Sequence, residues 1–159
     1  MSVHNVSWNV TSSGLGSTEV IEASMNWLTG GLGEISREKV KSYHGSKMIM
    51  ISAQINRKKD AKSSICHLGP KLLDELSASK DLDDKIDEKN ILHIRLSVPA
   101  LVCGSIELSD GPEEQVKGRI KLEVYPGQDV VENARKMLIE SSKRAIEEGL
   151  PIPIDSRNG

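Results

Sequence analysis

The fold of this chain is indicated most clearly by the stretch Val116-Lys117-Gly118-Arg119-Ile120-Lys121-Leu122-Glu123-Val124-Tyr125, in which apolar or small residues alternate with polar ones. Successive side chains of a β-strand point to opposite faces, so this pattern predicts a strand with one buried and one exposed face. The exposed face would carry three cations, followed by Glu123 and Tyr125. Such a strand is typical of an antiparallel sheet that is covered on one face only.

Similar patterns elsewhere supply partners for this strand. Alternation predicts further strands over residues 6–10, 35–43, 47–55, 91–98 and 103–108. Apolar residues at helical spacing predict helices over 17–28, 60–76 and 129–148, with Ser17, Asp60 and Asp129 at their starts. Because Gly69-Pro70 interrupts the second helix, we expect a kink or two shorter helices there.

The predicted order of elements is β-α-β-β-α-β-β-β-α. Short connections between half-polar strands favour antiparallel pairing. We therefore expect an α+β fold of two layers, with helices packed on one face of a largely antiparallel sheet and the other face open. Residues 1–150 would form this domain, and residues 151–159 a C-terminal tail.

Composition narrows the class of protein. The chain has 159 residues and a formal net charge of −2, which argues against a uniformly basic nucleic-acid coat or a polybasic membrane binder. Its apolar runs are too short to span a bilayer, and its first ten residues lack the pattern of a secretory signal. Two distant cysteines, Cys66 and Cys103, are expected to be small buried groups in a reducing compartment. These features predict a cytoplasmic protein.

No motif of catalysis or metal binding is recognisable. Gly14-Leu15-Gly16 has Glu19 where a dinucleotide fingerprint requires its third glycine, so a plain glycine turn is favoured. The four histidines form no i, i+4 pair and neighbour no nucleophile signature. The acidic run Asp81–Glu88 lacks the spacing of a calcium loop, and interleaved lysines indicate a solvated surface. We predict a protein that is not an enzyme and needs neither cofactor nor metal.

Basic residues follow two of the expected strands at alternate positions. They are Arg37, Lys39 and Lys41 in one strand and Lys117, Arg119 and Lys121 in the other, with Arg95 of a third strand as a seventh. If these strands share one sheet, the cations gather on its open face, although the parity of residues 35–43 is ambiguous. Like charges on neighbouring strands repel, so the cluster favours a phosphate-bearing partner. The alternative is that these residues only solubilise the sheet and prevent edge pairing.

Four segments occur together and in order: Val40-Lys41-Ser42-Tyr43-His44-Gly45, then Ile49–Ile55, then Asn90-Ile91-Leu92-His93-Ile94-Arg95-Leu96, then Val116–Pro126. From about Val6 to Glu148 the chain resembles a family of small archaeal proteins described as RNA-binding proteins and predicted exosome subunits. The family's fold is similar to that of the ribosomal protein that binds 5S rRNA. The resemblance implies RNA binding without catalysis, alongside the RNA-processing exosome.

The resemblance carries over three residues by position: His44, Gly45 as a turn residue, and Arg95. One segment departs from the family pattern. After Arg95-Leu96 the family often has Lys-Gln followed by small and aromatic residues, whereas this chain has Ser97-Val98-Pro99-Ala100-Leu101. If relatives contact RNA there, this chain has lost that contact.

The sequence thus predicts a non-catalytic RNA-binding protein, an accessory or predicted subunit of the archaeal exosome, that contacts phosphates with low specificity. The scarcity of aromatic residues argues against a base-stacking platform. The alternative is an interaction module whose basic face docks an acidic protein. An enzyme would require His44, His93 and an acid to meet in a cleft. The candidate RNA-binding residues are Arg37, Lys39, Lys41, His44, Arg95, Lys117, Arg119 and Lys121.

Overall fold

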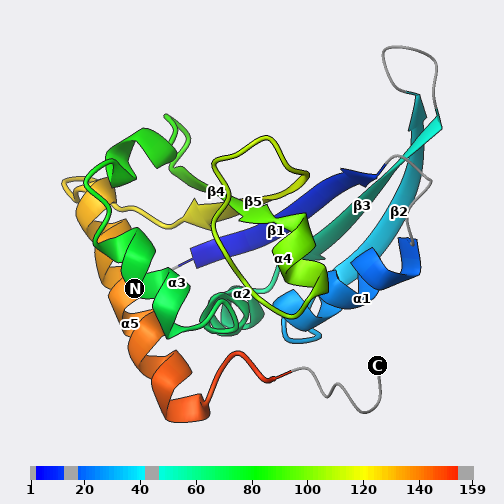
Figure 1. Cartoon of the computed structure of the whole chain (residues 1–159). Coiled ribbons are helices and arrows are strands. Elements are labelled where there is room, and N and C mark those ends of the chain that lie inside the picture. The colour runs from blue at the N-terminus through cyan, green and yellow to red at the C-terminus, as the bar shows by residue number, and fades with distance from the viewer. Residues whose placement is uncertain (1–2, 13–17, 42–46, 154–159) are drawn as a thin grey trace.

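One antiparallel sheet of five strands runs through the computed structural model, which describes residues 3–12, 18–41 and 47–153 (Figure 1). The strands occur in the order β2-β3-β1-β5-β4, so β1 is central and β2 and β4 are the edges. Their bounds are Val3–Ser12 (β1), Glu34–Lys41 (β2), Lys47–Ile55 (β3), Ile91–Ser97 (β4) and Gln115–Leu122 (β5).

The helices pack against one face of this sheet (Figure 1). The strands β1, β3, β4 and β5 place mostly apolar or small side chains at alternate positions on that face, and the helices bury their own apolar stripes against them. None of the helices in the described part of the chain is long and apolar enough to cross a membrane. The helices are α1 (Thr18–Leu28), α2 (Lys58–Cys66), α3 (Pro70–Ser77), α4 (Val98–Val102), α5 (Val130–Glu148) and a 3-10 turn, η1 (Leu82–Lys85).

The predicted α+β fold with an antiparallel, one-sided sheet is therefore confirmed. The hairpin of β2 and β3 is antiparallel, and α5 begins as expected, because Asp129 accepts hydrogen bonds from the backbone N–H groups of Val131 and Glu132. The expected interruption at Gly69-Pro70 separates α2 from α3, since Gly69 has a φ of 88° and Pro70 occupies the first turn of α3.

Three local predictions are wrong. Residues 103–108 do not form a strand: Ser97 accepts a hydrogen bond from Ala100 N–H and starts α4, and only an isolated bridge joins Leu108 to Leu96. Asp60 lies inside α2 rather than at its cap, which is Arg57. Cys103 is exposed, while Cys66 is buried as expected.

Tight packing at the sheet centre joins β1 to β5. Trp8 pairs with Gly118 across these strands, and its indole covers the glycine on the helix side. A Cβ atom at Gly118 would lie 2.3 Å from Cζ3 of Trp8, so no larger residue fits beside this indole. The glycine thus allows the largest side chain of β1 into the core.

The segment after α5 turns back toward α1. Gly149 adopts the left-handed conformation that ends the helix. The indole Nε1 of Trp27 in α1 then donates a hydrogen bond to the carbonyl oxygen of Ile152 at 2.6 Å. Pro151 packs against Gly69, the residue that separates α2 from α3. The first residues of the expected tail are therefore held against the helical layer.

Candidate nucleic-acid interface

The sheet face opposite the helices is polar, and we refer to it as the open face. Its residues are those that alternate with the buried positions, because paired residues of antiparallel strands lie on the same face. The open face includes Ile91, His93, Arg95 and Ser97 of β4, Gln115, Lys117, Arg119 and Lys121 of β5, Asn5, Ser7, Asn9 and Thr11 of β1, and Met50, Ser52 and Gln54 of β3.

Cations gather on the β4–β5 half of the open face. Arg95 pairs directly with Lys117, and His93 pairs with Arg119. Lys121 follows on the same strand, and its ammonium group donates to the backbone carbonyl of Lys89. We refer to Lys89, Arg95, Lys117, Arg119 and Lys121 as the basic band.

Acids do not neutralise the exposed centre of this band. Among the described residues, no carboxylate forms a salt bridge with Arg95, Lys117 or Arg119. Arg95 donates only a long hydrogen bond, 3.4 Å, to the amide oxygen of Gln115. Opposed like charges destabilise a sheet unless an anion offsets them. The arrangement therefore presents unneutralised positive charge to the solvent.

A polar hollow adjoins the basic band on β1 and β3. Asn5, Ser7 and Asn9 pair with Lys121, Arg119 and Lys117, respectively, and Ser52 and Gln54 lie on the far side of β1. The hollow has a volume of about 400 Å³, and Lys89, Ile91, Arg119 and Lys121 also line it. Amides and hydroxyls donate and accept hydrogen bonds, so this surface can contact phosphate oxygens, ribose hydroxyls or base edges.

Arg37 and Lys39 of β2 lie on the other face of the sheet. Arg37 pairs with Ile51, which is fully buried under the helices, and Lys39 occupies the same face two residues later. The guanidinium of Arg37 binds Glu22 of α1, with its Nε donating to Oε2 at 3.2 Å. The prediction that Arg37 and Lys39 share the open face is therefore wrong.

The ambiguity of β2 explains this error. Ile35 and Val40 are its two apolar residues, and they fall on opposite faces of the strand. As a result, the alternation alone does not define a buried side. A one-residue change of parity moves every side chain of a strand to the other face, so the error affects Arg37 and Lys39 together.

The structure leaves two further candidates, Lys41 and His44, without a described side chain. The backbone of Lys41 pairs with Lys47, and the structure describes no side chain at either position. His44 lies outside the described residues. Both remain predictions.

The alternation predicted that Glu123 and Tyr125 continue the exposed stripe of β5. In the structure they do not. The strand ends at Leu122, and Glu123 is only 9% exposed. Its carboxylate accepts hydrogen bonds from Lys58 Nζ at 2.5 Å and from the Tyr125 hydroxyl at 2.7 Å, and these bonds raise the pKa of both partners. Glu123 is therefore a buried partner of Lys58 and not an exposed acid on the stripe.

An Asp–His pair flanks the band at the start of β4. The carboxylate of Asp87 lies 2.8 Å from Nε2 of His93 and accepts hydrogen bonds from the backbone N–H groups of Lys89 and Ile91. These partners, His93 first, lower the pKa of Asp87 to about 2. The carboxylate thus orients His93 on the open face and anchors the turn that carries Lys89.

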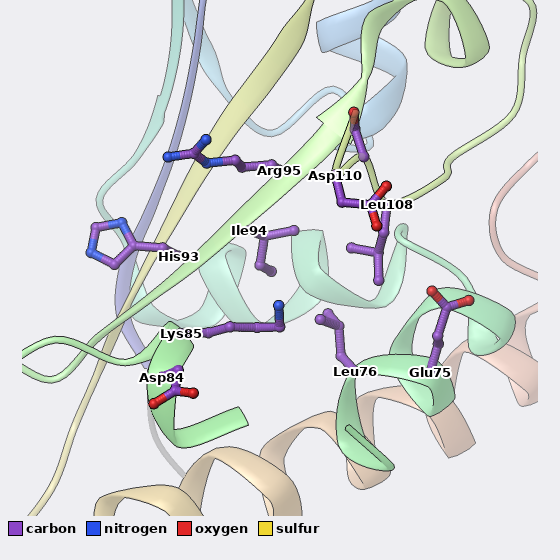
Figure 2. A pocket seen from close by; sticks show the side chains of 10 residues that line it. Glu75, Leu76, Asp84, Lys85, His93, Ile94, Arg95, Leu108 and Asp110 are labelled. Atoms are coloured by element: carbon purple, nitrogen blue, oxygen red, sulfur yellow. The ribbon is translucent and has the colours of Figure 1, made fainter. Parts of the chain in front are cut away.

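A second cavity, of about 440 Å³, lies beneath the outer edge of β4 (Figure 2). In Figure 2 the side chains of His93 and Arg95 point away from it toward the open face, whereas Ile94 points into it. Residues of α3, η1 and the loop 108–110 form its other walls. No group of three or more His, Cys, Asp or Glu side chains suited to a metal occurs in the described part of the chain.

Sequence reasoning missed several of these residues. Lys89 lies in a turn, where no periodicity predicts its direction. Asn5, Ser7 and Asn9 could have been found, since the alternation of β1 already assigns them to the polar side. Their position beside the cations depends on the pairing of β1 with β5, which are more than 100 residues apart in the chain.

Comparison with known proteins agrees with this architecture. A family model described as RNA binding matches residues 17–125, more than half of the chain. The sequence of this chain, whose sheet carries a cationic face, therefore matches an RNA-binding family. The chain belongs to that family, which confirms the resemblance seen in the sequence. No curated protein matches it.

Solved archaeal structures share the fold. Mth689, a DUF54 protein from Methanothermobacter thermautotrophicus, superimposes with a TM-score of 0.71 at 23% identity, covering 87% of this chain and 99% of that one. AF2318 from Archaeglobus fulgidus gives 0.69 at 20% identity, with coverage of 87% and 99%. A UPF0201 protein from Methanococcus jannaschii gives 0.59 at 8% identity, with coverage of 84% and 98%. At such identities the likeness shows a common fold.

Proposed function

We propose that this protein binds RNA through the basic band and the adjoining polar hollow, without catalysing a reaction. The observation that carries the proposal is the unneutralised pairing of Arg95 with Lys117, beside Arg119, on a sheet face that none of the described helices covers. Membership of an RNA-binding family supports the same conclusion.

Phosphate contacts would supply most of the affinity. Lysine and arginine side chains neutralise backbone phosphates and release counterions, which gives binding that weakens steeply with salt. The open face offers no Phe, Tyr or Trp side chain among its described residues, so it does not form a stacking platform. The amides of Asn5, Asn9 and Gln54 would add hydrogen bonds to riboses or base edges. We therefore expect low sequence specificity on this face.

Charge reversal tests the assignment. The double variant Lys117→Glu/Arg119→Glu removes two cations whose side chains are exposed, so the fold should survive. Fluorescence anisotropy with a labelled RNA should show much weaker binding for every RNA tested. The slope of log affinity against log salt should shrink by about 1.4, the value for two phosphate contacts to a single strand.

The matched control is Lys136→Glu/Lys143→Glu, which makes the same change of net charge on exposed residues of α5. Its affinity should stay close to that of the wild type, because the helices lie on the opposite side of the sheet. Equal losses in both double variants would mean that only net charge matters, and the proposed face would then be wrong.

The band also suits an acidic protein as partner, and the resemblance implies an association with the exosome. A pull-down with and without nuclease separates these possibilities from RNA binding. RNA-bridged partners should be released by nuclease, and we expect this result. A complex that persists after nuclease, together with no RNA affinity at low salt, would instead assign the face to protein docking.

A further inference from the structure

The outer edge of β4 is hydrogen-bonded at both ends and open in the middle. Along an antiparallel strand, the N–H and C=O of one residue point toward the neighbouring strand and those of the next residue point away from it. In β4 the groups of residues 91, 93, 95 and 97 point away from β5. At one end, Ile91 exchanges outward hydrogen bonds with Asp87. At the other end, the Arg95 carbonyl accepts from Ser109 N–H, and Ser97 N–H donates to Glu107.

Two backbone groups remain in the gap between these ends. The isolated antiparallel bridge between Ile86 and Leu92 sets the N–H of His93 against the carbonyl of Lys85, just as it sets the N–H of Asp87 against the carbonyl of Ile91. By the same alternation, the C=O of His93 and the N–H of Arg95 point outward, and they have no hydrogen-bond partner among the described residues. An edge with free donors and acceptors can pair with another strand. Here, however, the gap is only three residues long, so it is too short to hold a peptide strand of ordinary length.

These free groups face the cavity beneath β4 (Figure 2). Leu76 of α3, Ile94 and Leu108 line it; Leu76 and Ile94 are almost fully buried, and Leu108 is the half-buried apolar side chain among the three. Lys85 of η1 extends into it, and Asp84 and Asp110 lie at its margin. Its volume, about 440 Å³, is within the range of small-molecule sites.

We propose that this cavity receives one unpaired base of a bound RNA. A flat base would pack on the Leu108 side chain and bond in its plane to the His93 carbonyl and the Arg95 N–H. Adenine and cytosine present the matching edge, an amino donor beside a ring-nitrogen acceptor. The nearby carboxylates favour amino groups and disfavour the two carbonyls of uracil.

This inference rests on the proposed function, since the RNA backbone would be held on the open face. His93 and Arg95 connect the two sites: their side chains lie on the open face, and their backbone borders the cavity. A chain lying on the basic band could therefore pass over the β4 edge and place one extruded nucleotide beneath it. Lys85 would then attract the phosphate of that nucleotide. RNA-binding proteins commonly read bases that are unstacked in this way.

The test uses one RNA hairpin with a bulged adenosine, the same stem fully paired, a bulged-uridine version, and free AMP. In ¹H–¹⁵N spectra of the full chain, the bulged adenosine should shift the backbone signals of His93, Arg95 and residues 108–110. The paired stem should shift only open-face signals. In affinity, the adenosine bulge should exceed the uridine bulge by about tenfold, as expected for one packed base.

A lysine variant gives an independent readout. Lys85→Ala should weaken binding of the bulged-adenosine hairpin by about fivefold and leave the paired stem unaffected. Lys80→Ala, a change of the same kind in the preceding turn, should affect neither RNA. Because Lys85 is only partly buried, the variant is expected to fold.

The outcomes separate this inference from the proposed function. If all hairpins shift only open-face signals with equal affinity, the base pocket is wrong and the RNA-binding face stands. If AMP shifts the cavity signals but no RNA does, the occupant is a free nucleotide, and the RNA assignment of the cavity is overturned. If no RNA binds at low salt, the proposed function itself fails.

Discussion

The indole of Trp8 occupies the space that a side chain at position 118 would need, and only glycine, which has no Cβ atom, fits there. Gly118→Ala places a methyl group where only 2.3 Å separates it from Trp8 Cζ3. Overpacking of this kind costs about 2 kcal/mol, and urea unfolding should show that loss. The control Gly33→Ala meets its nearest neighbour at 3.3 Å without a positive φ and should change stability much less. Equal effects of the two substitutions would contradict this view of the sheet centre.

Asp87 makes stability depend on acid pH. Its pKa falls from 3.8 to about 2 in the folded protein, mainly through its bond to His93. A lowered pKa stabilises the fold above the unfolded value, and this contribution disappears as the pH falls from about 4 to about 2. Asp87→Asn should therefore lower the urea midpoint at pH 5 and reduce its decline between pH 4 and pH 2. Glu88→Gln, in the same turn, serves as the control, and an unchanged acid decline in Asp87→Asn would contradict the assignment.

Among the elements, α2 and α5 start differently although each has an aspartate near its N-terminus. Asp129 accepts backbone hydrogen bonds at the start of α5, whereas Asp60 lies within the first turn of α2 and does not cap it. Asp129→Ala should therefore destabilise the protein by about 1 kcal/mol. Asp60→Ala should cost less than about 0.5 kcal/mol, the scale of a charge near a helix end. Equal costs in denaturant unfolding would show that the caps are misassigned.

The β-strands show which element-level predictions the residues support. In β5 and β4 every second residue is apolar or small, so the buried face was predictable. In β2 the apolar residues divide between both faces, and only its register with β3 assigns them. Residues 103–108 were predicted as a strand, but they follow the short helix that Ser97 caps and form a loop in which only Leu108 bridges Leu96. Local pattern thus predicts an element well when a single face is apolar.

For the whole molecule, the two faces of the sheet divide the basic residues into separate groups. Lys39 lies on the helix-covered side of an edge strand, and the basic band lies on the other. Lys39→Glu should leave RNA affinity within about twofold of the wild type near 0.15 M salt, because solvent screens charges beyond about 8 Å. The same anisotropy titration checks this expectation. A loss as large as that of the Lys117→Glu/Arg119→Glu variant would place the interface on the β2 side.

The sequence by itself determined the α+β class, the antiparallel sheet with one covered face, the inward residues of β4 and β5, and the resemblance to an RNA-binding family. The first three features follow from local periodicity, which depends only on neighbours in the chain, whereas the resemblance rests on four segments and their order. Tertiary structure alone decided which cations lie together, because strand pairing joins residues such as Asn5 and Lys121 that are far apart in sequence. It also decided the cavity beneath β4, where α3, η1 and a loop meet a strand edge whose backbone groups no side-chain pattern encodes.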